Sequence, residues 1–183
     1  MTKYFKINAA LIVAGVLLLP VVHAASMSKA DYKAGKTRIS EEYKADKTAC
    51  KSQAGNAKDI CVERAKGKEK VALAELEYSY TSKYKDQAKV LVVKANADYE
   101  VAKQMCDDKA GNEKDVCIKE AKAAETTALA DAKMGKQIHD ATLEANEDKR
   151  SADHKVAVEK CYALAGDAKD SCIAAAQAKY GMK

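Results

Sequence analysis

Six cysteines are the residues of this chain with the most evident chemical potential, and they occur as three pairs. In each pair a glycine lies between the two cysteines, in the pattern Cys-x4-Gly-x5-Cys. Thiols at a repeated spacing can form disulfides, bind a metal or take part in redox exchange, and the spacing distinguishes these uses. The pairs are Cys50 with Cys61, Cys106 with Cys117, and Cys161 with Cys172.

Structural disulfides fit this spacing better than a metal or redox site. Zinc-binding cysteines usually lie about two to four residues apart, and redox pairs use Cys-x-x-Cys, and the chain has neither spacing. The repetition itself selects the three local pairs. His139 and His154 lie far apart, with no second histidine at helical spacing. We therefore interpret them as surface or interface residues, and we expect no metal and no cofactor.

The residues around each glycine predict a tight turn between two antiparallel helices. Glycine commonly ends a helix in the left-handed conformation, and a following Asn or Asp commonly caps the next helix. An acid three residues further on completes a variant of the capping box. The predicted turn glycines are Gly55, Gly111 and Gly166, and the predicted capping residues are Asn56 with Asp59, Asn112 with Asp115, and Asp167 with Asp170.

The two cysteines of a pair would face each other across such a turn. On one continuous helix they would be about 16 Å apart at about 1.5 Å per residue, which is too far for a disulfide. The chemistry of the bridge therefore supports the turn as well. Each bridge should stabilise the fold by on the order of 3 kcal/mol.

The first 24 residues are predicted to form a cleaved secretory signal peptide. Lys3 and Lys6 give the positive start, an apolar stretch follows from Ala9 to Leu19, and Val22-His23-Ala24 is a small-residue cleavage site. Residues 25–183 would then form a single helical repeat domain, with no membrane span after cleavage. Export favours disulfides and predicts a periplasmic location, with secretion beyond the outer membrane left open.

The mature part has few residues that could build a thick hydrophobic core. Only twenty Leu, Ile and Val residues and no Phe follow position 24, whereas alanine, lysine and glutamate are abundant. These three are strong helix formers. The composition therefore predicts an all-α protein whose helices meet in thin interfaces of Ala, Val and Tyr.

The spacing of the repeats sets the expected order of the helices. The first cysteines of the pairs lie 56 and then 55 residues apart. We expect about four helices, two of them long, in an elongated antiparallel bundle or zigzag with turns at 50–61, 106–117 and 161–172. The polar stretch Ser79–Gln87 is where the second helix could break. The expected helices are Lys29–Ala54, Cys61–Cys106, Cys117–Cys161 and Ala168–Tyr180.

Charge and motifs argue against several function classes. The formal net charge is +5, to which the predicted signal peptide contributes two lysines, and elsewhere lysines alternate with acids as on solvated helix faces. Together with export this disfavours nucleic acid and leaves weak binding to an anionic envelope surface. The chain has no glycine-rich phosphate loop, Gly-x-Ser-x-Gly or His-Glu-x-x-His motif. We therefore expect no enzyme and assign no catalytic residue.

An exported, Ala/Lys/Glu-rich helical chain with this cysteine repeat resembles a group of Gram-negative bacterial proteins labelled TolA-like or cell envelope biogenesis proteins. The resemblance covers most of the mature chain and is mainly compositional. It implies a helical, coiled-coil-like protein of the cell envelope. The chain differs from TolA, which keeps an N-terminal membrane anchor and has a globular C-terminal domain, and no TolA functional residue carries over.

Two functions follow as hypotheses. The first is a non-catalytic periplasmic structural or interaction protein, whose disulfide-closed hairpins hold extended helices rigid for envelope proteins or for self-association. The alternative is a stress-responsive, chaperone-like or ligand-binding helical protein that exposes apolar surface. A filled bundle would favour the first hypothesis, and a concave apolar face would favour the second.

Overall fold

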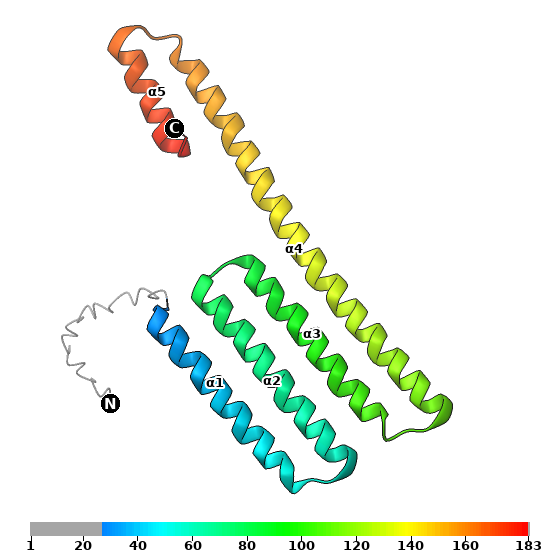
Figure 1. The fold of residues 1–183 in the computed structure, drawn as a ribbon. Helices are drawn as coiled ribbons and strands as arrows, with labels where there is room; N and C mark the ends of the chain where they lie inside the picture. The colour runs from blue at the N-terminus through cyan, green and yellow to red at the C-terminus, as the bar shows by residue number, and fades with distance from the viewer. Residues whose placement is uncertain (1–26, 183) are drawn as a thin grey trace, which may run out of the picture.

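The computed structural model describes residues 27–182, which fold into helices joined by short turns (Figure 1). No strand occurs among these residues, so the all-α prediction is confirmed. The predicted signal peptide, residues 1–24, lies outside the described residues. The elements are α1 (Lys29–Ala49), a short 3-10 helix (Cys50–Ser52), α2 (Gly55–Thr81), α3 (Tyr84–Cys106), α4 (Gly111–Cys161) and α5 (Gly166–Tyr180).

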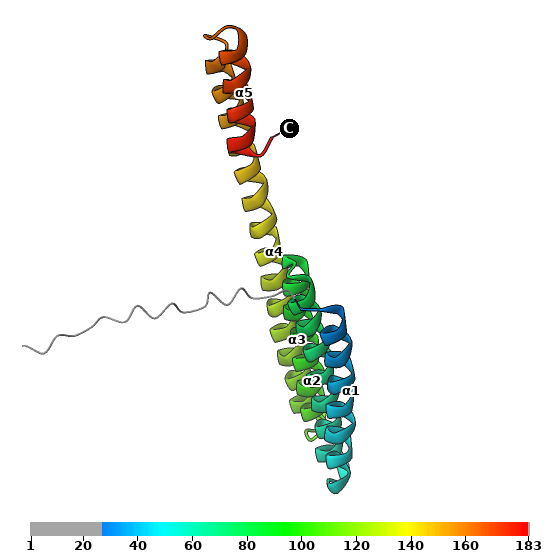
Figure 2. The same ribbon diagram turned by 90° about the vertical axis from the view of Figure 1, so that its left-hand side faces the viewer.

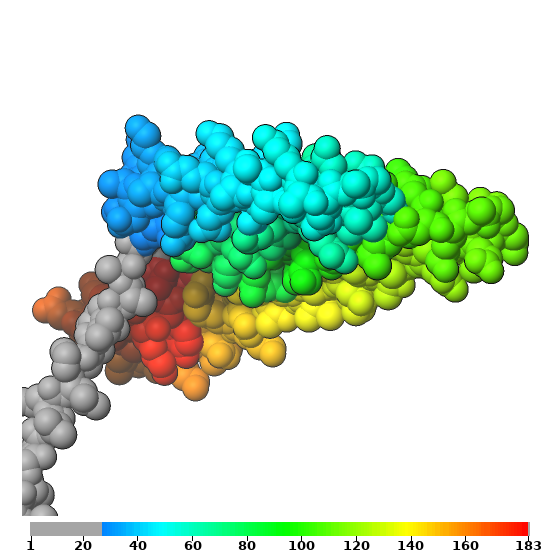
Figure 3. Space-filling model, turned by 90° about the horizontal axis from the view of Figure 1, so that it is seen from below, coloured from blue at the N-terminus to red at the C-terminus, as the bar shows by residue number. Residues whose placement is uncertain are grey.

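The helices form a row in which each one packs against its neighbours in the sequence. Within residues 27–182, contacts between α-helices join only α1 to α2, α2 to α3, α3 to α4, and α4 to α5. Consecutive helices run antiparallel (Figures 1 and 2). Figure 3 shows α1 at one edge of the row and α4 at the opposite edge. Of the two predicted arrangements, an antiparallel bundle or a zigzag, the structure therefore shows the zigzag.

Within residues 27–182 the chain forms five α-helices where the sequence predicted four, because the second predicted helix breaks. The break lies at Ser82 and Lys83, inside the Ser79–Gln87 stretch. Ser82 has a left-handed φ of 53°, and Lys83 is extended. Thr81 Oγ1 donates to Asp86 at 2.6 Å and accepts from the Lys83 N–H at 3.3 Å. Short polar side chains thus stabilise the turn that makes α2 and α3 a hairpin.

The second long helix is confirmed and is longer than predicted. α4 contains 51 residues and spans about 75 Å at 1.5 Å per residue. It begins at Gly111 instead of Cys117, and α5 begins at Gly166 instead of Ala168. α1 ends at Ala49, before the predicted end at Ala54, because the 3-10 helix starts at Cys50.

Small side chains fill the interfaces between the helices. A methyl group added at Gly67 of α2 would lie 3.1 Å from Cβ of Ala97 in α3, and one added at Gly35 of α1 would lie 2.8 Å from the Leu76 side chain. Helices that approach so closely need glycine or alanine at the contact. The buried alanines are Ala65, Ala74, Ala88, Ala95, Ala132 and Ala176.

The second half of α4 extends beyond the row. Tyr84, the first residue of α3, stacks on His139 of α4 with ring centroids 3.6 Å apart, and α3 reaches no further. Beyond it, every residue of Ala141–Arg150 is exposed, until α5 returns along the end of α4 (Figure 1). We call α4 from Asp140 onward, together with α5, the arm.

Candidate functional site

The three predicted disulfides are present, and each closes a turn between antiparallel helices. The Cα atoms are 5.6 Å apart in Cys50–Cys61 and 5.7 Å apart in Cys106–Cys117 and Cys161–Cys172. The first cysteine of each pair is 1% exposed. All six cysteines are bridged, so none serves as a nucleophile or a metal ligand.

The turn glycines adopt the predicted left-handed conformation, but at a different point of the turn. Their φ angles are 56° at Gly55, 53° at Gly111 and 54° at Gly166. Each glycine is the first residue of the following helix, whereas α3 and α4 already end at Cys106 and Cys161. A Cβ atom at any of them would meet nothing within 4 Å. Backbone conformation, and not space, therefore requires glycine here.

The Asn and Asp residues after the glycines do not cap the helices, so this part of the prediction is wrong. An extended alanine occupies the N-cap of α2, α4 and α5, with no side-chain cap bond, because the glycine already belongs to the helix. The predicted caps Asn56, Asn112 and Asp167 are second residues of their helices. The predicted acids Asp59, Asp115 and Asp170 are exposed fifth residues, too far along to bond to the cap.

Asn56 instead connects the first turn to the end of α3. Its Nδ2 donates to the Gln104 carbonyl oxygen at 2.9 Å, and Gln104 Nε2 donates to Asn56 Oδ1 at 2.7 Å. Gln104 Nε2 also donates to Asp107 in the next turn at 3.0 Å. The sequence carried no signal for this link, because the repeat places Thr48 and Glu159 at the equivalents of Gln104.

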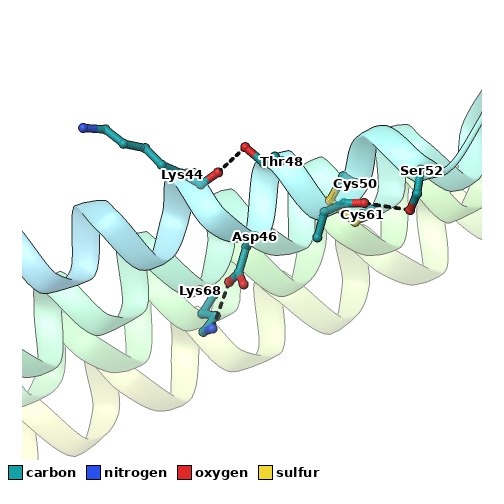
Figure 4. The surroundings of a disulfide bond; sticks show 8 residues. Lys44, Asp46, Thr48, Cys50, Ser52, Cys61 and Lys68 are labelled. Atoms are coloured by element: carbon teal, nitrogen blue, oxygen red, sulfur yellow. Dashed lines mark hydrogen bonds and ion pairs between the residues drawn. A yellow bond between two sulfur atoms is a disulfide. The ribbon is translucent and has the colours of Figure 1, made fainter.

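A salt bridge beside the first disulfide joins α1 to α2 (Figure 4). Lys68 Nζ lies 2.8 Å from Asp46 Oδ2, and this hydrogen bond raises the pKa of Lys68. At the end of the 3-10 helix, Ser52 Oγ donates to the Ala49 carbonyl oxygen at 2.8 Å. The first hairpin is thus held by polar bonds as well as by its disulfide.

The equivalent place in the α3–α4 hairpin is an alanine-lined groove. The repeat places Ala102 and Ala124 at the positions of Asp46 and Lys68. These two alanines line a groove of about 320 Å³. Glu125 lies beside them, 8% exposed, and its carboxylate is 2.5 Å from Lys122 Nζ. That hydrogen bond raises the pKa of Lys122, and the ammonium also lies 4.9 Å from the ring centroid of Tyr99. The buried carboxylate therefore has a charged partner.

A larger groove of about 470 Å³ runs over one face of α1, α2 and α3. Its lining combines Leu73 and Val93 with lysines from all three helices and with two glutamates. Tyr32 lies at the border of the groove. Two contacts hold it there: its hydroxyl donates to Glu77, and its ring stacks on Tyr80 with the ring centroids 4.5 Å apart. The bond to Glu77 raises the pKa of Tyr32. This groove is chemically suited to a segment that is both apolar and charged.

The two described histidines also lie between helices. His139 stacks on Tyr84, and His154 packs edge-on against Tyr180 with centroids 6.1 Å apart. This places both among the interface residues of the predicted surface or interface positions. Within residues 27–182 no group of three or more His, Cys, Asp or Glu is placed to hold a metal. In the same part of the chain, none of the helices is both long enough and apolar enough for a membrane crossing.

Comparison with known proteins found no match to a family model, to a curated protein or to a solved structure. The resemblance to TolA-like proteins therefore stays a prediction.

Proposed function

We propose that this chain is a non-catalytic structural or interaction protein of the bacterial cell envelope, exported to the periplasm. The observation that carries the proposal is a long helix, α4, with a disulfide-closed turn at each end. The bridge Cys106–Cys117 fixes its start to α3, and Cys161–Cys172 fixes its end to α5. A rigid helix of about 75 Å, fixed at both ends, is suited to keep partners at a set distance.

The three disulfides support the proposed location, because such bridges persist in oxidising compartments such as the periplasm. The predicted signal peptide would deliver the chain there. Envelope proteins or further copies of the chain are the proposed partners. The mature chain would keep a mild positive charge after losing the two signal-peptide lysines, which would add a weak attraction to anionic envelope surfaces. Nucleic acid is not among the proposed partners.

The side chains that most often carry catalysis serve structural roles, which supports a non-catalytic protein. All six cysteines are bridged. His139 and His154 pack against tyrosines of neighbouring helices, and the buried Glu125 is paired with Lys122.

The proposal can be tested in a strain that lacks the protein. We expect this strain to be sensitive to detergent and to leak a periplasmic enzyme, and we expect the wild-type chain to correct both defects. A Cys106→Ser/Cys117→Ser variant should fail to correct them, because α4 loses its fixed attachment to α3.

The matched control is Cys50→Ser/Cys61→Ser, which removes the bridge of the α1–α2 hairpin and leaves α1 packed on α2 through buried side chains such as Ile39 and Leu76. This control variant should largely restore detergent resistance and retention of the periplasmic enzyme. Immunoblots must show equal abundance of the variants in the periplasm. A cytoplasmic location, or full restoration by the Cys106→Ser/Cys117→Ser variant, would contradict the proposal.

The groove across α1, α2 and α3 favours a second candidate, a chaperone-like or ligand-binding protein. Under this function the wild-type protein should suppress the aggregation of a reduced, unfolding client. Leu73→Gln, inside the groove, should weaken the suppression. The matched control is Leu91→Gln on α3, which is 51% exposed and not part of the groove lining. Absence of suppression by the wild-type protein would reject this candidate.

A further inference from the structure

One face of α4 corresponds to the face through which α2 binds α3, but in α4 this face has no partner. In α2, Gly67 and Ala74 are buried, and Gly67 lies against Ala97 of α3. The repeat offset of 56 residues places Ala123 and Ala130 of α4 at the same positions, and both are exposed. Because α4 does not turn back at its midpoint, no described helix takes the place of α3 beside it.

The second half of α4 carries the other side of the same interface. On α3, Ala97 and Val101 line the contact region with α2. The offset of 55 residues places Ala152 and Val156 of α4 at these positions. Ala152 is exposed, and Val156 is 55% exposed. One face of α4 therefore holds both halves of the α2–α3 interface, and a surface that contains both halves can pair with itself.

Large apolar side chains connect the two halves. Met134 is 54% exposed and Ile138 is 60% exposed. Neither side chain faces α3, because Met134 lies about 140° and Ile138 about 100° around the helix from His139, which stacks on Tyr84 of α3. A continuous exposed apolar stripe marks an interaction surface. Exposed alanines three or four residues apart extend the stripe on both sides of Met134 and Ile138: Ala130, Ala141 and Ala145.

We propose that α4 pairs in antiparallel orientation with α4 of a second copy of this chain through this face. The first half of each α4 then packs on the second half of the other, and twofold symmetry forms the contact twice. The contact reproduces that of α2 with α3, the most extensive helix contact among the described residues. The register of Gly67 on Ala97 places Ala123 against Ala152 of the second copy. The pairing rests on the proposed interaction function and names a partner for α4.

Cross-linking of the full oxidised protein tests the register. In the pair, Lys119 lies beside Lys155 of the second copy, whereas within one extended α4 the same two lysines are about 54 Å apart at 1.5 Å per residue. Protein labelled with ¹⁵N is mixed with unlabelled protein and treated with a short amine-reactive cross-linker. We expect Lys119–Lys155 peptides that join a heavy chain to a light chain.

Two matched variants test the face. Ile138→Glu places a charge in the centre of the stripe and should convert the dimer to a monomer in sedimentation equilibrium. Leu143→Glu is the control, since Leu143 is 57% exposed but lies about 140° away around the helix, and this variant should remain a dimer. Circular dichroism should show equal helicity in both variants, because glutamate is a good helix former.

Three outcomes would overturn the pairing: a monomeric wild-type protein, equal behaviour of the two variants, or Lys119–Lys155 links only within one chain. The last result would mean that α4 folds back on itself. None of these outcomes removes the detergent sensitivity expected of the strain without the protein. Failure of the pairing is therefore distinguishable from failure of the proposed envelope function.

Discussion

The turn between α2 and α3 and the midpoint of α4 occupy the same place in the repeat, yet the chain reverses at the first and continues at the second. The reversal uses Thr81-Ser82-Lys83, whereas the aligned residues of α4 are Gln137-Ile138-His139. Ser82 has a φ of 53°, a conformation that a β-branched residue such as Ile138 rarely adopts.

The comparison shows that two kinds of turn control this fold. The turns between repeats are fixed by a disulfide and a left-handed glycine, and they recur three times. The turn within a repeat depends on a few hydrogen bonds, such as the one from Thr81 to Asp86. Whether a repeat is a compact hairpin or a long helix is therefore decided by a few side chains.

Transfer of the α2–α3 turn into α4 should have the largest effect. The variant Gln137→Thr/Ile138→Ser/His139→Lys/Thr142→Asp copies the side chains that form that turn. We expect the second half of α4 to fold back on the first, which covers its exposed face. Small-angle scattering should show a monomer. Its maximum dimension should be about 35 Å less than that of a chain with an extended α4, which is the length of the folded-back helix at 1.5 Å per residue.

The control for this transfer is Gln137→Ala/Ile138→Ala/His139→Ala, which keeps strong helix formers at the same positions and should leave α4 extended. An unchanged maximum dimension in the Thr-Ser-Lys variant would show that packing, and not local turn chemistry, keeps α4 straight.

The same contrast explains which parts of the fold could be predicted from the sequence. The disulfides and the all-α class were predictable, because the cysteine spacing and the helix-forming composition act locally. The break at Ser82 was indicated only as a polar stretch, because Ser and Thr also occur inside helices. The N-caps were predicted wrongly, because residue types around Gly111 do not reveal that a left-handed glycine begins the helix.

Contacts between distant residues were beyond the sequence analysis. The bonds between Asn56 and Gln104 join residues from different repeats, and no periodic pattern points to them. The groove that Tyr32 bounds needs three helices at defined distances. Features of this kind depend on how the helices pack, which residue types and spacing do not determine.

The disulfides should differ in importance between the arm and the row. α5 has 15 residues and one buried residue, Ala176, and an isolated helix of that length is marginal in water. α1 has further contacts, including the bond from Tyr32 to Glu77. Removing Cys161–Cys172 with a double Ser substitution should therefore free α5, with a loss of about 3 kcal/mol or about 100-fold in amide protection.

Hydrogen exchange measures this difference directly. In the matched Cys50→Ser/Cys61→Ser variant we expect α1 to keep most of its protection. Equal losses in α1 and α5 would mean that the bridges alone, without the packing between helices, determine local stability in both regions.

The smallest effects should come from the turn glycines and the residues that follow them, and they compare two turns of the same sequence pattern. Gly111→Ala forces a left-handed φ of 53° on a residue with a side chain and should cost about 1–2 kcal/mol in urea unfolding.

Asn56→Ala removes the paired bonds with Gln104 and should cost about 1 kcal/mol. Asn112→Ala should cost only a few tenths, because Asn112 does not cap α4. Equal losses for Asn56→Ala and Asn112→Ala would instead indicate that both residues cap their helices in solution.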